Sequence, residues 1–426
     1  MRRQALDNFT PIAEYISQKA EPESLQTIRK DAFEAYQKTL LTPITKVSYD
    51  RWALFDPIIP ESKTVPETLT AINMDNSITL YGQKMVSYRI ADSWKKQGVI
   101  LEDIETAIKK HSDLFFKYFK NIIDHYDLDK VTGYHLAALT NGIFFYVPKG
   151  AQLEGALTVN LVKNDQEESA FNPHLLYVLE DETTCEIIEK TSSYGAEANS
   201  LNMHVELFMG NSATLSYHPV DTLNSNQAGF VNRWAQLYND AKLNVTNGLF
   251  NHGQVITNYL VDLRGEGAMA DVHAVSITED RHQQIANVTV NNYGRHTNGN
   301  ILQKGVVLDH SRLSFNGIGH IFRGANGSES EQEERLLMFS DAARGDANPI
   351  LLIDENDVKA GHAASVGRVA EEELYYLMSR GLSTNEARRL VIKAFLGQVL
   401  AQIHDKDLRQ EFLDLIDEKL RDHDEL

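Results

Sequence analysis

The chain has 426 residues, and its 41 Lys and Arg against 60 Asp and Glu give a net charge of −19. This acidic balance disfavours binding to nucleic acid or to an anionic membrane surface. The single cysteine, Cys185, excludes an intrachain disulfide and any metal site made only of this chain's thiolates. No apolar run approaches the roughly 18 residues of a membrane span, and no secretory signal is recognisable, so we expect a cytoplasmic protein.

Apolar residues at helical spacing predict an N-terminal helical region over residues 1–133. One face is formed around residues 12–16, and a second helix is predicted over residues 24–41. A poorly periodic segment that contains three prolines follows. Helical spacing then returns over residues 101–126, where an apolar stripe indicates a side that packs into a core.

From about Tyr134 the apolar period changes from helical to alternating, as in Leu215 and Tyr217. Short polar turns separate the alternating runs, and several of these turns end in an alanine. Ala213, Ala241 and Ala268 follow one another at nearly constant spacing. A small residue that returns with a fixed period after a turn indicates stacked coils.

Two folds fit the alternating region, a parallel β-helix and an antiparallel sandwich. The Asn-Gly pairs that begin at positions 141, 247, 298, 316 and 326 permit the tight hairpins of a sandwich. The repeated turn favours the solenoid. We therefore predict a mainly β protein with a parallel β-helix core over residues 134–357, flanked by N-terminal and C-terminal α-helical domains.

The C-terminal residues 358–426 are predicted to form a junction and a helical domain. A helix over residues 371–380 can end at Gly381 in the left-handed conformation. Ser383 and Glu386 have the spacing of a capping box, which opens a second helix. A third amphipathic helix follows.

Sequence motifs of catalysis are missing. The chain contains no G-x-x-x-x-G-K-[ST], no G-x-S-x-G and no H-E-x-x-H, so we expect no enzyme and no catalytic residue. The glycines of residues 317–327 indicate tight turns, and the charge run Glu329–Glu334 indicates a solvated edge. Cys185 is interpreted as a buried thiol. A metal-binding stack is less favoured than isolated polar histidines for a group of five: His273, His282, His296, His310 and His320.

A histidine surrounded by small residues stands out near the end of the β region. His362 is flanked by Gly361, Ala363 and Ala364, which leave the imidazole accessible to a partner. On these physical grounds alone, a domain junction packed with small residues is the favoured interpretation.

The same segment resembles a known family. Val358–Gly367 is similar to the motif V-K-x-x-H-x-A-[ST]-V-G near the end of the β-helix in the SufB/SufD family. Leu374–Gly381 resembles the following Y-L-x-S-R-G, and Tyr146–Gly150 resembles the V-Y-V-P-K-G that opens the β-helix. The similarity extends from about residue 98 to the C-terminus. One cysteine in the chain, and Ala360 where many members have a cysteine, favour the SufD branch.

The resemblance implies a non-catalytic scaffold for assembling iron–sulfur clusters and passing them to apo-proteins. The implied partners are a SufB-like homologue and a SufC-like ABC ATPase. His362 is implied to lie at the homologue interface, where it shares iron or a nascent cluster with a partner cysteine. Tyr376, Leu377, Arg380 and Gly381 are implied to bind a partner, since the C-terminal helices dock the ATPase.

The resemblance implies no cofactor bound by the chain alone, although it is compatible with a flavin in the complex. It is also compatible with a homodimer of the isolated chain. A different class of function is kept as the alternative, a β-helical carbohydrate-active lyase or hydrolase with carboxylates along a groove.

Overall fold

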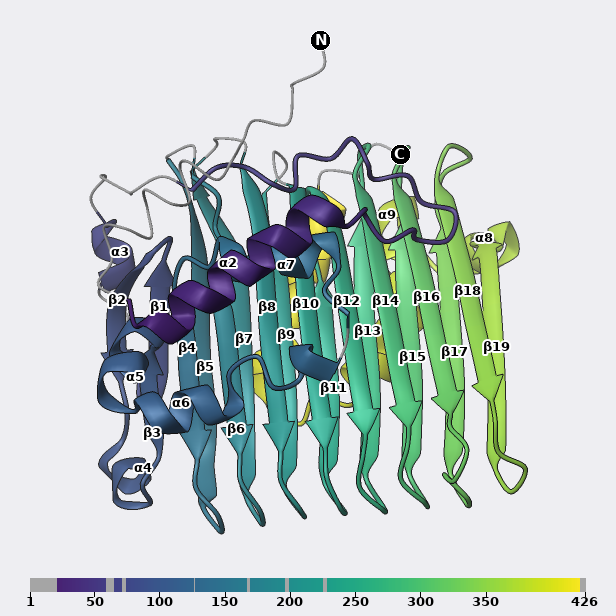
Figure 1. Cartoon of the computed structure of the whole chain (residues 1–426). Coiled ribbons are helices and arrows are strands. Elements are labelled where there is room, and N and C mark those ends of the chain that lie inside the picture. Colours follow the sequence, from purple (N-terminus) through teal and green to yellow (C-terminus); the bar gives the residue numbers. More distant parts are fainter. Residues whose placement is uncertain are drawn as a thin grey trace.

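The computed structural model describes residues 21–58, 65–70, 74–125, 127–166, 169–195, 199–224 and 228–421. Figure 1 shows a long stack of strands with helices on both sides. Successive strands alternate between two sheets, and every pairing from β4 onward along the stack is parallel. The prediction of a mainly β protein with a parallel solenoid flanked by helices is therefore confirmed.

The two sheets run the length of the stack. In spatial order, the ten-stranded sheet contains β19 (Lys359–Arg368), β17 (Glu329–Met338), β15 (Asn298–Val307), β13 (Met269–Thr278), β11 (Lys242–Leu249), β9 (Thr214–Thr222), β7 (Thr184–Gly195), β5 (Gln152–Asp165), β1 (Ser77–Tyr81) and β2 (Lys84–Arg89). The nine-stranded sheet contains β18 (Arg344–Ile353), β16 (Arg312–Ile321), β14 (Gln283–Asn292), β12 (Gln254–Leu263), β10 (Ala228–Leu237), β8 (Ser200–Met209), β6 (His174–Leu179), β4 (Gly142–Val147) and β3 (Ile100–Asp103).

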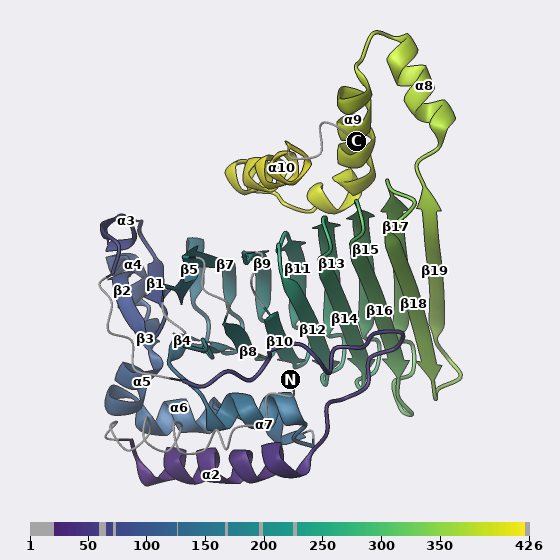
Figure 2. The same cartoon turned by 90° about the horizontal axis from the view of Figure 1, so that it is seen from above.

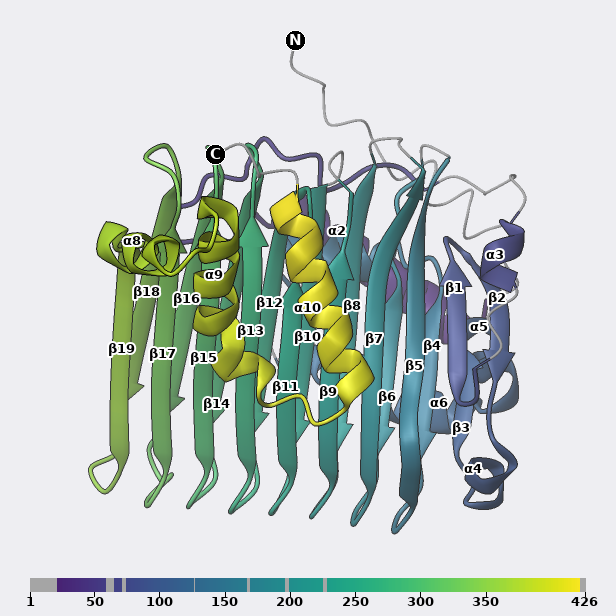
Figure 3. The same ribbon diagram turned by 180° about the vertical axis from the view of Figure 1, so that it is seen from behind.

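Helices cover the outer faces of both sheets (Figures 2 and 3). The N-terminal helices are α2 (Glu23–Lys38), α3 (Glu67–Thr70), α4 (Asp92–Lys96), α5 (Ile104–Lys110), α6 (Ser112–Tyr118), the short 3₁₀ helix η1 (Ile123–His125) and α7 (Lys130–Ala137). The C-terminal helices are α8 (Glu371–Ser379), α9 (Thr384–Leu400) and α10 (Lys406–Arg421). Helices α2, α6 and α7 lie along the nine-stranded sheet, whereas α9 and α10 lie on the ten-stranded sheet. None of the helices in the described ranges is long and apolar enough to span a membrane.

The repeated turn explains why the chain coils. At one edge of the solenoid a residue with positive φ is followed by a small buried residue, so the chain turns without a protruding side chain. The positive-φ residues include Ser212, Asp240 and Gly267, and the buried residues after them are Ala213, Ala241 and Ala268. The amide of Asp240 donates to the carbonyl of Glu266 in the next turn at 2.9 Å. The spaced alanines thus mark stacked turns, as predicted.

The three largest apolar cores of the described residues follow from this arrangement. The largest lies between the two sheets and is formed by inward side chains of successive strands, such as Val245, Val272 and Ile301. A second core joins the ten-stranded sheet to α9 and α10. A third joins the nine-stranded sheet to α2, α5 and α6.

Several predicted elements differ from the structure. Residues 101–126 do not form one helix, because Asp103 at the end of β3 caps α5 by accepting the amide hydrogen of Thr106, and the chain breaks again before α6. The proline-containing segment is followed by β1 and β2, which the apolar spacing did not predict. Strands also extend beyond residue 357, since β19 ends at Arg368. The helix expected around residues 12–16 lies outside the described residues.

The helix ends predicted for the C-terminal region agree with the structure. Helix α8 ends before Gly381, whose φ is +99°, and the capping box is present at the start of α9. There the amide of Ser383 donates to Oε2 of Glu386 at 2.8 Å. The Asn-Gly pairs at 141, 247, 298 and 316 lie at the beginning of or within parallel strands, so they make no hairpins.

Candidate functional site

Both sheets end on the same side of the solenoid. Strand β19 is the terminal strand of the ten-stranded sheet, and β18 is the terminal strand of the nine-stranded sheet. Within the described part of the chain, no strand pairs with the outer edge of either one. At the opposite end the terminal strands β2 and β3 join through antiparallel pairs and are short, with six and four residues against ten in β18 and in β19. The β18–β19 end is therefore open, and its backbone groups are available for pairing.

His362 lies on β19 at this open end. The strand pairs in parallel with β17, and His362 is opposite Gln332. Ala360 and Ala364 lie two residues away on either side, so no bulky neighbour on the same face crowds the imidazole. The segment around His362 is thus a solenoid strand and not a domain junction, and His362 is exposed.

The open end also exposes apolar side chains. Ile350, Leu352, Ile353 and Val366 have exposed fractions between 38% and 46%. Isolated exposed apolar residues are ordinary, but these four lie on two adjacent terminal strands next to unpaired backbone groups. This combination is typical of a strand edge that pairs with another chain.

The strand beneath β19 corrects one prediction. Residues 329–334 belong to β17, and every second side chain points between the two sheets. Ser330, Gln332 and Glu334 are almost completely buried. The interpretation of this charge run as a solvated edge holds only for Glu329, Glu331 and Glu333, because the strand's alternation places the other polar groups inside the solenoid.

Helix α8 carries the predicted partner-binding residues. None of its side chains is buried, and Tyr376 is 56% exposed. The guanidinium of Arg380 lies 5.3 Å from the centre of the Tyr376 ring. Tyr375 and Met378 add exposed apolar area. Figure 2 shows α8 standing away from the sheet, so the structure brings these residues together on a surface distant from the core.

The other two C-terminal helices are anchored to the sheet. Phe412 of α10 packs edge to face against Phe250 with ring centres 5.8 Å apart. The buried ammonium of Lys419 donates to Glu279 at 2.7 Å and to the carbonyl of Asn251 at 2.9 Å. His252 also lies 2.6 Å from the same Glu279 oxygen, and these partners hold the pKa of Glu279 at about 2 despite its burial. Helix α8 is thus followed in the chain by two helices that are anchored to the sheet.

A group of buried histidines was not predicted from the sequence. His174 and His204 stack with an angle of 7° between their rings, and Nε2 of His135 lies 3.1 Å from Nδ1 of His174. Burial lowers the pKa of His135 and of His204 well below the usual value, and the neighbouring imidazoles add to the effect. His174 and His204 lie at paired positions of successive turns. Once the repeat is known, that spacing is a signal that predicts their contact.

The histidines begin a polar column on the face of the nine-stranded sheet opposite the core. Paired positions along it are His174, His204, Asn232, Asn258, Asn287, Asn316 and Asn348. From Asn258 onward, each side-chain amide donates to the side-chain carbonyl of the asparagine before it, at 2.6–2.9 Å. The column ends on β18 at the open end.

A charged network lies inside the solenoid, far from the open end. The guanidinium of Arg233 donates to Glu189 at 2.9 Å and to Asp221 at 2.8 Å. The hydroxyl groups of Tyr177 and Tyr217 also donate to Glu189, at 3.0 and 2.7 Å. Each of these five side chains is buried. The donors and acceptors satisfy one another, which indicates a structural role.

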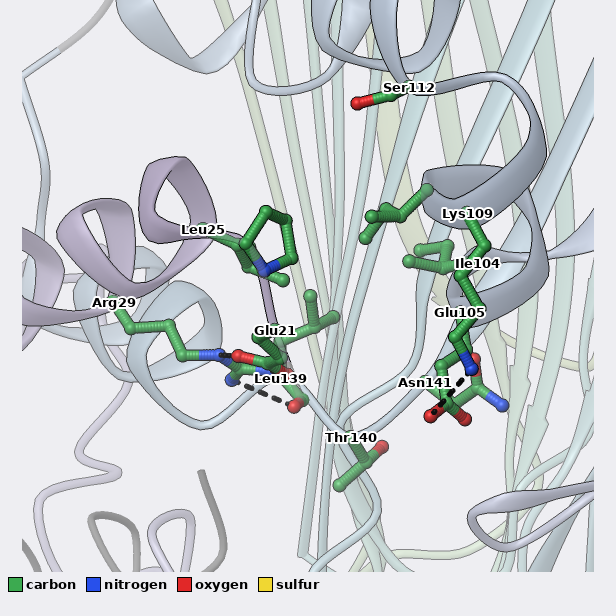
Figure 4. Close-up of a pocket in the computed structure, with 12 residues that line it drawn as sticks. Glu21, Leu25, Arg29, Ile104, Glu105, Lys109, Ser112, Leu139, Thr140 and Asn141 are labelled. Atoms are coloured by element: carbon green, nitrogen blue, oxygen red, sulfur yellow. Dashed lines mark hydrogen bonds and ion pairs between the residues drawn. The ribbon is translucent and has the colours of Figure 1, made fainter. Parts of the chain in front are cut away.

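A pocket of about 310 Å³ lies between α2 and α5 near the other end of the solenoid (Figure 4). Arg29 forms an ion pair with Glu21 at 2.7 Å and donates to the carbonyl of Leu139 at 2.9 Å. Lys109 lies 3.8 Å from Glu105. The charged side chains of this pocket are thus paired with one another, and it contains none of the predicted site residues.

Cys185 is buried in the core between the sheets, and burial together with Glu186 raises its thiol pKa, as expected for an inert thiol. No group of three or more His, Cys, Asp or Glu side chains in the described ranges is arranged to hold a metal ion. The last of the five histidines of residues 273–320 illustrates their separate environments. The ring of His320 stacks on Phe322, and its Nε2 lies 3.0 Å from Asp354.

Comparison with known proteins gives the family. Residues 161–395 match the SufBD core domain of the SUF system for FeS cluster assembly. The chain is 36% identical over 416 residues to the iron-sulfur cluster assembly protein SufD of Bacillus subtilis (strain 168), covering 94% of this chain and 95% of that protein. It is 24% identical over 317 residues to SufB of the same organism, covering 74% and 68%. A SufBD family protein of Staphylococcus saprophyticus is 24% identical over 319 residues, with the same coverage. The chain therefore belongs to the SufBD family of iron–sulfur cluster assembly proteins.

Proposed function

We propose that this chain is a non-catalytic scaffold subunit for iron–sulfur cluster assembly in the cytoplasm, which pairs with a SufB-like homologue and binds a SufC-like ATPase. The relatives named above are iron–sulfur assembly proteins, whereas nothing among them supports the carbohydrate-active alternative. The observation that carries the proposal is the open end of the solenoid, where both sheets terminate together and His362 is accessible.

A homologue with the same fold suits this end. Terminal strands with unpaired amide and carbonyl groups accept another strand by continuing the sheet. A second solenoid that ended in the same way would offer two strands at once, and the exposed apolar side chains of β18 and β19 would be covered in the same contact. The partner would thus extend both sheets across the interface.

His362 would then lie at the junction of the two chains. Neutral imidazole is a competent ligand for iron, and thiolate is the usual ligand of iron–sulfur clusters. Cys185 is buried away from this end, so this chain offers no thiolate there. Partner cysteines would have to supply the remaining coordination of a shared cluster, which is the cargo of the complex.

The test is the iron and sulfide content of the purified complex after anaerobic reconstitution. His362→Ala removes an accessible side chain, so it should change the free energy of unfolding by less than about 1 kcal/mol. Cluster content should fall severalfold while the subunits still co-purify. His310→Ala is a matched control, because His310 is an exposed histidine in the turn after β15. Equal cluster content in wild type and His362→Ala would contradict the role of this residue.

Helix α8 is proposed as the docking site of the ATPase. Its exposed aromatic residues and Arg380 form a mixed apolar and basic surface, of a composition common in the centres of interfaces. Removing the whole C-terminal region would expose the core beneath α9 and α10, so point variants give a cleaner test. Arg380→Glu should abolish co-purification with the ATPase, and Lys406→Glu, which makes the same charge change at the start of α10, should not. Retained binding by Arg380→Glu and by Tyr376→Ala would contradict the assignment.

A further inference from the structure

The last closed layer of the solenoid interior contains three polar side chains. Ser330, Gln332 and Glu334 of β17 point between the sheets, and each is at most 3% exposed. Four of their oxygen atoms make no hydrogen bond of normal geometry: the hydroxyl of Ser330, Oε1 of Gln332 and both carboxylate oxygens of Glu334. Buried polar atoms in proteins are nearly always paired, so four unpaired oxygens in one layer need an explanation.

The position of this layer near the end of the solenoid does not explain the unpaired oxygens. Along the column that contains Gln332, the preceding turns carry the apolar residues Val245, Val272 and Ile301. That column becomes polar only at Gln332 and then at His362. The neighbouring column that contains Glu334 is polar earlier, at Asn247 and Gln303. A terminal turn can be polar because it faces bulk solvent, but these side chains are almost completely buried. The change from apolar to polar therefore places ligand-type atoms directly beneath His362.

The opposite sheet makes room for them. Two glycines of β16, Gly317 and Gly319, face the same layer. A Cβ atom at position 317 would lie 2.4 Å from Oε1 of Glu334 and 3.3 Å from Oε1 of Gln332. A Cβ atom at position 319 would lie 2.4 Å from the hydroxyl of Ser330. Glycine is thus required for these oxygens to lie where they do, and one oxygen of Gln332 and one of Glu334 both lie beside Gly317.

The unpaired atoms of Gln332 and Glu334 are all hydrogen-bond acceptors. The side-chain amide of Gln332 already donates to the carbonyl of Ile350 at 3.0 Å, which directs its oxygen toward the unpaired set. No lysine, arginine or histidine of the described residues forms an ion pair with Glu334. Burial raises the pKa of this carboxyl group to about 7, in spite of nearby backbone amides at Gly317 and Asn348. A bound cation would give these unpaired acceptor oxygens a partner.

We propose that the oxygens of Gln332 and Glu334 bind a divalent metal cation inside the last layer of the solenoid, one strand below His362. Carboxylate and amide oxygens suit hard or borderline divalent ions, which they bind at about 2.0–2.6 Å. The remaining coordination positions face β19, where small residues flank His362, and water or His362 can fill them. The identification of this cation as Fe²⁺ rests on the proposed function; the site itself rests on the unpaired oxygens.

The site is tested on the isolated full chain with the metal alone. Fe²⁺ is titrated anaerobically by calorimetry, and Mn²⁺ binding is followed by electron paramagnetic resonance. Wild type should bind one ion per chain. Glu334→Gln keeps the shape of the side chain and should weaken binding at least tenfold. Glu331→Gln, which removes an exposed carboxylate from the same strand, should leave affinity unchanged. Gly317→Ala, which fills the space beside both oxygens, should also weaken binding.

Each outcome decides the proposal. Tenfold weakening in Glu334→Gln and Gly317→Ala, with circular dichroism and melting temperature retained, would support it. No binding by wild type, or equal affinity in wild type and Glu334→Gln, would overturn it. Failure of the proposed function is distinguishable, because it is measured as cluster content of the complex in His362→Ala. Normal clusters in that complex would contradict the proposed role of His362 and leave the metal titration of the isolated chain unaffected.

Discussion

The charged network inside the solenoid gives the most demanding test of the fold. Arg233 is the cation of a buried group that also contains Glu189 and Asp221. Its guanidinium makes charge-assisted hydrogen bonds of 2.8–3.2 Å to the two carboxylates. Arg233→Met preserves most of the side-chain volume and removes the positive charge. Two carboxylates then remain buried without a counterion.

The expected cost is large. Removing one partner of a buried ion pair typically destabilises a protein by about 3–5 kcal/mol, chiefly because the remaining charge is left uncompensated. The hydroxyl groups of Tyr177 and Tyr217 still donate to Glu189, which favours the lower part of that range. The sign of the pH dependence also follows. Unpaired buried carboxylates have a raised folded-state pKa, so the variant binds more protons when folded, and its deficit should shrink as the pH falls.

The assay is equilibrium urea unfolding followed by circular dichroism at pH 7.5 and pH 5.5. Arg233→Met should unfold at a clearly lower urea concentration at pH 7.5, with a smaller difference from wild type at pH 5.5. The triple variant Glu189→Gln, Asp221→Asn, Arg233→Met removes every charge and should recover at least half of the loss. A single variant within about 1 kcal/mol of wild type, or a triple variant less stable than the single one, would refute the reasoning.

Two further perturbations probe the packed faces. His135 and His204 have folded-state pKa values below the unfolded value of 6.5, so their contribution to the free energy of unfolding is complete above pH 6.5 and is lost as the pH falls below it. His204→Phe should therefore flatten the dependence of melting temperature on pH between 7 and 5. An unchanged slope would contradict this reasoning. Phe412→Ala should cost about 3–5 kcal/mol in the core beneath α10, and hydrogen exchange should accelerate in α10 but not in β6, which lies in the other sheet.

The repeat was predictable from the sequence because its cause is local. A turn residue with positive φ, followed by a small residue, recurs from coil to coil. The requirement for a small residue is seen in the sequence as the spaced alanines Ala213, Ala241 and Ala268. The capping box of α9 is equally local, since Ser383 and Glu386 contact each other's backbone and side chains. Such local signals can be recognised in the sequence without knowledge of any tertiary contact.

The missed features depend on contacts across turns. Strand β19 is rich in alanine and glycine, which have low strand propensity, and it forms because its backbone pairs with β17. The burial of Glu334 was hidden for a related reason. Charged residues in succession usually lie on a surface, and only the register of β17 against Gly317 places this carboxylate inside. His362 was found through its motif, while its place on a terminal strand came from the structure.

The two ends of the solenoid differ in how their strand edges are protected. At the first end, the edge strands β2 and β3 are short, with six and four residues, and pair antiparallel with their inner neighbours. At the other end, two ten-residue strands present unpaired edges together with exposed apolar residues. Such an edge is a template for uncontrolled association unless a specific partner covers it. The asparagine column also ends there on Asn348, with each preceding carbonyl already engaged by the following amide. A partner strand with a donor at that position would continue the column, so the open end favours one register of pairing over others.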